Sequence, residues 1–353
     1  MEKVLLGMSG GKDSTWACRV LQEMGYEVEG LLLVLHESAP VKEAQLAADR
    51  LGIKLHIADY SESFKREVEE YFAREYLEGR TPNPCVECNR KIKFSALADE
   101  ADRLGIEKIA TGHYVTVGKA GDRYTLSQAL DAKKDQSYFL WQLTQELLSR
   151  FVSPLEKASK DEVVRRVTEN SLIDEIKESQ EICFIPDDDY VSFLKARLSP
   201  EDCEKAFKEG DFVKLNGEAV GKHKGYASYT VGQRKGLGIA LGRPAFVVGI
   251  SSEDNRVILG FEEDNRCEGF VADSLNFVST PEFEGERRFF VRPRYRSPLI
   301  PCTVNITNGK AEVITDVPIK LVSPGQSAVF YDEEGRVMLG GKICRNARNG
   351  VNF

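Results

Sequence analysis

A glycine-rich loop near the N-terminus has the residues and the position of a phosphate-binding site. Ser9-Gly10-Gly11-Lys12-Asp13-Ser14 lies between an apolar run at 4–8, which predicts a strand, and residues 17–24, whose apolar spacing predicts a helix. Glycines let the backbone approach a ligand, and a helix N-terminus offers free N–H groups to an anion. The loop is not a Walker A sequence, because that pattern's first glycine and the hydroxyl residue after its lysine are missing. We predict an ATP site that does not catalyse ordinary phosphoryl transfer; the alternative is a plain strand-to-helix turn.

Two cysteines in a proline-rich segment, residues 81–89, could also carry chemistry. The prolines favour an extended loop that presents Cys85 and Cys88, and Asn89 is placed to cap the next helix. That helix carries Arg90, Lys91 and Lys93. Because a helix N-terminus and nearby cations stabilise a thiolate, we expect a lowered pKa and therefore nucleophilic or metal-binding thiols.

A zinc half-site is the alternative for these cysteines, but no second C-x-x-C and no histidine pair accompanies it. Cys183 lies in similar loop-like surroundings ahead of Pro186. Cys18 and Cys203 are expected to be packing residues. Cys88 and Cys183, with Cys85, are therefore the candidate catalytic thiols.

Composition sets the class of protein. The chain has 353 residues, 42% of them hydrophobic and 29% charged, which predicts two or three globular domains. It has no long unbroken apolar stretch and no signal-peptide pattern, so we expect no membrane span and a cytoplasmic location. Eight cysteines are too few for a disulfide framework, and a net charge of −8 excludes a uniformly basic nucleic-acid binder.

The pattern of elements predicts an α/β fold followed by β structure. Strand and helix patterns alternate along the first part of the chain, which indicates a parallel sheet covered by helices on both faces. From about residue 211, short β-branched runs are separated by turn signals such as Asn216-Gly217 and Asn308-Gly309. We predict a catalytic domain at 1–208, a small β-rich middle domain at 209–265 and a C-terminal β-barrel at 266–353.

Several motifs occur in the order found in one family. Besides the two segments above they are T-G-H-Y at 111–114, K-D-Q-S-Y-F-L at 134–140, I-C-F-I at 182–185 and Y-T-V-G-Q-R-K-G-L-G at 229–238. In these motifs the chain resembles the bacterial tRNA-specific 2-thiouridylases, the MnmA/TrmU family, over nearly its whole length. The resemblance implies an ATP-pyrophosphatase (PP-loop) domain that adenylates a carbonyl oxygen.

The implied activity is ATP-dependent replacement of the C2 oxygen of the wobble uridine, U34, of tRNA by sulfur. By family position the ATP site, with Mg²⁺, is formed by Gly7, Met8, Ser9, Gly10, Gly11, Lys12, Asp13, Ser14, Leu33 and Gly112. Asn83, Pro84 and Cys85 would meet the target base, which must leave the anticodon stack. Contacts to tRNA would come from His113, Lys134, Asp135, Gln136, Arg294, Tyr295 and Gln326.

Cys88 and Cys183 match the two reactive cysteines of the family, in which Cys183 accepts a persulfide sulfur and Cys88 closes a disulfide. Sulfur would come from a donor protein or from inorganic sulfide. Position 85 is commonly aspartate in the family, whereas this chain has Cys85. We hypothesise that Cys85, Cys88 and Cys183 hold a [4Fe-4S] cluster with one open iron. The alternative is a persulfide relay with Cys85 as a bystander.

An acidic chain needs a local basic surface to bind RNA. Residues 287–296 contain five arginines and three aromatics, which could pair with phosphates and stack on bases; the alternative is an ordinary charged strand. Two competing functions stay open at this point: a PP-loop amidoligase or synthetase acting on a small-molecule carbonyl, and a non-enzymatic RNA-binding module. The former would not need the paired cysteines.

Overall fold

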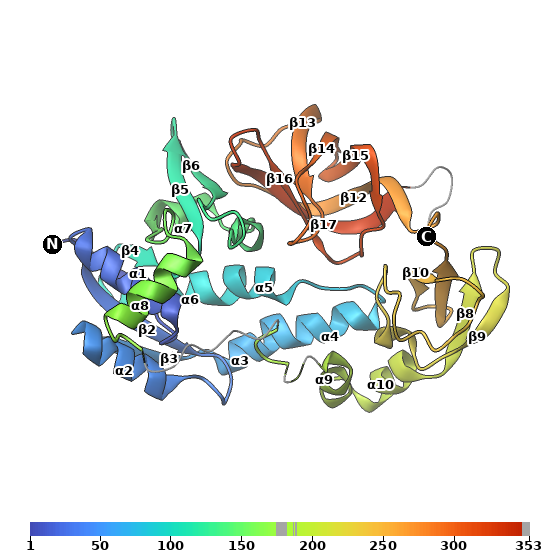
Figure 1. Ribbon diagram of the computed structural model, residues 1–353, viewed down its shortest axis with the longest axis horizontal. Coiled ribbons are helices and arrows are strands. Elements are labelled where there is room, and N and C mark those ends of the chain that lie inside the picture. Colours follow the sequence, from blue (N-terminus) through green and yellow to red (C-terminus); the bar gives the residue numbers. More distant parts are fainter. Residues whose placement is uncertain (174–181, 186, 188, 348–353) are drawn as a thin grey trace.

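The computed structural model describes residues 1–173, 182–185, 187 and 189–347. Within them a parallel sheet in the order β3-β2-β1-β4-β7 forms the core of the first part of the chain (Figure 1). Its strands are β1 (Lys3–Gly7), β2 (Glu27–Val34), β3 (Leu55–Asp59), β4 (Lys108–Ala110) and β7 (Phe151–Val152).

Helices cover both faces of this sheet, as the alternating pattern predicts. Along β1, Val4 and Leu6 pack in one apolar cluster with α1, α2 and α8, whereas Leu5 packs on the opposite face with α6. The helical segments are α1 (Lys12–Glu23), α2 (Val41–Leu51), α3 (Ser61–Phe64), η1 (Lys65–Glu69), α4 (Glu70–Leu77), α5 (Pro84–Glu87), η2 (Cys88–Phe94), α6 (Ser95–Leu104), η3 (Ser137–Leu140), α7 (Gln145–Arg150), α8 (Lys160–Glu169), α9 (Tyr190–Arg197) and α10 (Pro200–Phe207). Among the described residues, none of the helices has the length and apolar character needed to cross a membrane.

Three strands of the first part, a hairpin and a short edge strand, were not predicted. β5 (Val115–Ala120) and β6 (Arg123–Gln128) form an antiparallel hairpin after β4. The short strand β7 pairs with the edge of β4 through Ile109 and Ala110. At two residues, β7 is too short for a periodic signal, so only its tertiary pairing defines it.

The remainder of the chain is β structure, as expected. A four-stranded sheet in the order β10-β11-β8-β9 precedes a closed barrel in the order β12-β15-β14-β13-β16-β17. The strands are β8 (Gly210–Lys214), β9 (Ala219–His223), β10 (Phe246–Ser251), β11 (Arg256–Gly260), β12 (Arg266–Phe277), β13 (Gly285–Arg292), β14 (Ile300–Thr307), β15 (Lys310–Lys320), β16 (Ser327–Tyr331) and β17 (Val337–Ala347); a short 3₁₀ turn, η5 (Tyr226–Ser228), follows β9. Asn308 and Gly309 both have positive φ at the β14–β15 turn, which is the backbone of a tight hairpin. The exact limits of the three domains stay a prediction.

The barrel packs on the segment that carries the paired cysteines (Figure 1). Gln326 Nε2 donates hydrogen bonds to the carbonyl oxygens of Thr81 and Pro82 at 2.9 and 3.0 Å. The backbone N–H of Thr81 in turn donates to the Pro324 carbonyl at 2.8 Å. Because these bonds fix the backbone just before α5, the barrel determines where the helical segment with Cys85 and Cys88 lies.

Candidate active site

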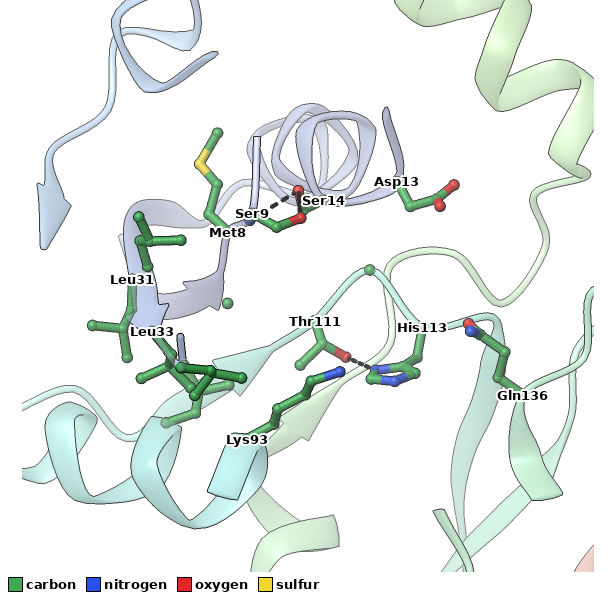
Figure 2. A pocket seen from close by; sticks show the side chains of 15 residues that line it. Met8, Ser9, Asp13, Ser14, Leu31, Leu33, Lys93, Thr111, His113 and Gln136 are labelled. Atoms are coloured by element: carbon green, nitrogen blue, oxygen red, sulfur yellow. Dashed lines mark hydrogen bonds between the residues drawn. The ribbon is translucent and has the colours of Figure 1, made fainter. Parts of the chain in front are cut away.

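A cavity of about 260 Å³ opens beyond the carboxyl ends of the parallel strands (Figure 2). This is where open α/β sheets bind ligands. Of the predicted ATP-site residues, Gly7, Met8, Ser9, Asp13, Ser14, Leu33 and Gly112 line it. The described lining also includes the candidate tRNA-contact residues His113 and Gln136, and Lys93, which sequence reasoning did not assign to it.

The glycine loop is tightly folded against its neighbours. Gly10 has φ +73°, and a Cβ there would lie 2.5 Å from the backbone of Glu43 and Ala44, so glycine is required for both conformation and space. Ser14 Oγ donates to the Gly11 carbonyl at 3.0 Å and accepts from the Ser9 N–H at 3.3 Å. These contacts shape the loop at the N-terminus of α1, where N–H groups are available to an anion.

Asp13 of this loop is held from two sides. Its carboxylate accepts a hydrogen bond from Tyr114 Oη at 2.7 Å and forms an ion pair with Lys160, whose Nζ is 2.6 Å from Oδ1. Burial lowers the pKa of Lys160, against the opposing effect of Asp13. This contact could not be predicted from sequence, because α8 is distant in the chain and Lys160 belongs to no recognised motif.

The cysteine segment is helical, so the predicted extended loop is wrong. Asn83 is the N-cap of α5, Cys85 lies within this helix, and η2 begins at Cys88 without a break. The predicted capping role of Asn89 is also wrong, because Asn89 lies inside the helical run and its Nδ2 donates to the Phe139 carbonyl at 3.2 Å. Pro84 marks the helix start, since proline is favoured at the first helical position.

The expected lowering of the thiol pKa values is corrected as well. Burial raises the pKa of Cys85 and raises that of Cys88 to about 12, and the positive charge of Lys93 opposes this only in part. The Cys88 side chain is buried among Phe64, Val68 and Ile92. Desolvation of the thiolate therefore outweighs the helix terminus and the neighbouring cation.

Cys183 differs from the other two thiols in being exposed. It borders a second cavity together with His36, Lys65 and Arg197. It nevertheless lies within electrostatic reach of Cys85, Cys88 and Lys93, so the structure brings the three predicted thiols into one neighbourhood. Across the described ranges, however, no group of three His, Cys, Asp or Glu side chains is arranged to hold a metal ion.

A buried carboxylate anchors the turn between the paired cysteines. Glu87 is 2% exposed; its Oε1 accepts from Lys342 Nζ of β17 at 2.8 Å and from Gln142 Nε2 at 3.0 Å. Burial acts to raise its pKa, but these partners prevail and the pKa is lowered. The helical segment with Cys85 and Cys88 is thus held by an ion pair with the barrel as well as by hydrogen bonds to its backbone.

The predicted tRNA-contact residues at 134–136 lie in different environments. Lys134 is exposed. Asp135 is buried and paired with Arg292 of β13, with Nη1 and Oδ2 2.9 Å apart. Gln136 Oε1 accepts from the N–H of Tyr114 at 3.0 Å, which ties this segment to the strand end beside the cavity.

His113 and the barrel residues have internal contacts. Burial, assisted by Lys93, lowers the pKa of His113 to about 3, and its Nδ1 is 2.8 Å from Thr111 Oγ1. Arg294 Nη2 donates to the Leu321 carbonyl at 2.6 Å, and the Tyr295 ring packs on Phe139 with centroids 4.3 Å apart.

Several arginines of residues 287–296 already have partners within the protein, as in an ordinary charged strand. Arg288 pairs with Asp316 across the barrel surface, and Arg292 is committed to its buried ion pair. Arg287 lies over the ring of Phe283 at 3.9 Å. The interleaved pattern therefore predicts more available phosphate-binding groups than the structure offers.

Comparisons with known proteins cover the whole architecture. Family models described as "tRNA methyl transferase HUP domain", "tRNA methyl transferase PRC-barrel domain" and "Aminomethyltransferase beta-barrel domain" match residues 2–187, 201–261 and 267–343. The chain is 41% identical to the tRNA-specific 2-thiouridylase MnmA of Carboxydothermus hydrogenoformans, over 96% of each chain. It is 42% identical to that of Syntrophotalea carbinolica, over 97% of this chain and 98% of the relative. A solved 4-thiouridine synthetase–RNA complex with bound ATP has 20% identity and a TM-score of 0.33, covering 48% of this chain and 41% of that chain, which is too distant to carry an argument.

Proposed function

This chain belongs to the tRNA-specific 2-thiouridylase MnmA family of tRNA-modifying transferases, and we propose that it thiolates C2 of the wobble uridine by ATP-dependent adenylation followed by persulfide transfer. One observation carries the proposal: Lys93 lines the glycine-loop cavity and lies within electrostatic reach of all three thiols. A flipped base between them could be activated on one side and receive sulfur on the other.

The adenylation half uses the strand-end cavity. The uridine O2 attacks the α-phosphate of ATP, an O2–P bond forms, and the bond to the β-phosphate breaks as pyrophosphate leaves with the electron pair. The N–H groups at the start of α1 stabilise phosphate charge, and Lys160 keeps Asp13 from repelling it. The poor carbonyl leaving group thereby becomes AMP.

The transfer half suits the contrast between the thiols. Cys183 is exposed and can receive a persulfide from an external donor, whereas Cys88 is enclosed. The terminal persulfide sulfur bonds to C2, and the C2–O bond breaks as AMP departs. The Cys88 thiolate then attacks the Cys183 sulfur, leaving 2-thiouridine and a Cys88–Cys183 disulfide, which an external dithiol reduces. The Cys88 proton goes to solvent.

The proposed reaction steps use neither Mg²⁺ nor a [4Fe-4S] cluster. In the part of the chain that is described, no metal-holding group is formed, and Asp13 at the cavity is already engaged by Lys160 and Tyr114. Cys85 is half-buried, Cys88 is buried and Cys183 is exposed, and these three described side chains are not arranged as a metal-holding group. Cys85 therefore acts as a neighbour of the reacting thiols in this proposal.

Reconstitution with full-length protein tests the proposal. ATP, an unmodified tRNA transcript bearing U34 and a persulfide donor should give 2-thiouridine at position 34 by nucleoside mass spectrometry, with one AMP per thiolation. Cys88→Ser and Cys183→Ser should abolish thiolation, while Cys203→Ser, a change of a thiol outside the site, should not. An amidoligase would keep ATP turnover in all three variants without forming thiouridine, which would overturn the proposal.

A further inference from the structure

The nucleotide cavity contains a cation that the loop motif does not predict. Lys93 lies in η2, five positions after Cys88, and its side chain reaches the cavity wall beside Thr111 and His113 (Figure 2). Among the described residues that line the cavity, it is the only lysine or arginine. Lys12 of the glycine loop is not part of this lining.

Lys93 is half-buried at the cavity wall, and the nearby thiols favour its charged form. Burial is the largest effect and acts to lower its pKa, but the thiols of Cys88, Cys183 and Cys85 act together to raise it, and the net pKa is raised. By contrast, Lys160, which lies beside the loop, is already paired with Asp13. The one carboxylate in the described cavity lining, Asp13, is engaged by Lys160 and Tyr114, so the Lys93 ammonium remains able to meet an anionic ligand.

We propose that Lys93 is a further catalytic residue, whose ammonium contacts the α-phosphate of the nucleotide and stabilises the negative charge that develops there as pyrophosphate, and later AMP, departs. The proposal rests on the adenylation step set out above and adds no bond change to it. Lys93 transfers no proton; it acts by charge in an enclosed site, where an electrostatic contact is stronger than in water. Because Lys93 lies near the thiols, its charge is close to the uridine C2 atom at which sulfur replaces oxygen.

The test measures tRNA-dependent pyrophosphate release by full-length protein with ATP and the U34 transcript. Lys93→Met should lower kcat at saturating ATP by about 10²-fold, the loss typical of one preorganised donor, with a smaller change in the KM for ATP. Lys93→Arg should recover part of the rate. Arg90→Met is the matched control, because it removes a positive charge from the same helical segment outside the cavity lining, and it should keep the wild-type rate.

A wild-type kcat in Lys93→Met, or an equal loss in Arg90→Met, would overturn the proposal. If Lys93→Met does not fold by circular dichroism, Lys93→Arg is assayed with the Rp and Sp diastereomers of ATPαS: contact with an α-oxygen predicts a changed rate ratio, and an unchanged ratio overturns it. Absence of pyrophosphate release by the wild-type protein would overturn the proposed function itself. Pyrophosphate release without 2-thiouridine would overturn only its sulfur-transfer half.

Discussion

The buried ion pair between Arg292 and Asp135 should be a main support of the contact between the barrel and the catalytic domain. Asp135 is fully buried, with 0% side-chain exposure, and Arg292 is 13% exposed. The carboxylate also accepts hydrogen bonds from the N–H groups of Ser137 and Ala129 and from the side chains of Ser137 and Gln128. Arg292→Met would leave this charge enclosed among neutral donors.

Removing one partner of a buried ion pair typically costs ~3–5 kcal/mol, because the remaining charge is uncompensated. The same strand provides a matched control: Arg288 and Asp316 form an ion pair with side chains 59% and 42% exposed. Arg288→Met should therefore change stability far less, because water and salt screen an exposed pair. The difference between the two variants isolates the effect of burial.

Urea unfolding followed by tryptophan fluorescence suits this comparison. Trp141 is buried at the same contact, and its Nε1 donates to Ser327 Oγ of the barrel at 3.0 Å. Arg292→Met should shift the midpoint far more than Arg288→Met. The double variant Arg292→Met/Asp135→Asn should be more stable than additivity predicts, because no unpaired charge remains. Equal shifts of the midpoint for both arginine variants would refute the conclusion that Asp135 has a structural role as the buried partner of Arg292.

Three further outcomes follow from the site. Gly112→Ala should abolish pyrophosphate release, because a Cβ there would lie 2.9 Å from the backbone of Asp13 and Ser14; retention of wild-type kinetics would contradict the tight loop packing. Between pH 6.5 and 3, His113 binds a proton in the unfolded state but not in the folded state, where its pKa is about 3, so stability should fall as pH falls. Thermal unfolding should show a smaller fall in His113→Asn, and identical pH curves for the two proteins would contradict this. Alkylation of the Cys88 peptide, followed by mass spectrometry, should be slow at pH 7.5 and accelerate with pH, since its pKa is about 12; rapid alkylation at neutral pH would show a stabilised thiolate.

Much of this protein could be read from local patterns in the chain. The continuous apolar run that includes Val4, Leu5 and Leu6, the glycine loop before α1 and the Asn308-Gly309 hairpin turn are properties of neighbouring residues, so sequence predicted them. The order of the motifs likewise identified the family. Local backbone geometry and short-range periodicity need no knowledge of distant contacts.

Tertiary structure decided what the chemically active side chains experience. Sequence placed Cys88 beside cations and predicted a lowered pKa, but packing against Phe64 and Val68 raises it, because desolvation depends on segments that fold over the thiol. The same holds for Asp135, which lies in a plausible RNA-binding motif and is enclosed by a barrel strand more than 150 residues away. The sequence determines the charge and spacing of these side chains. Their burial arises only when distant elements pack together, and burial determines the pKa and the partner of each charged group.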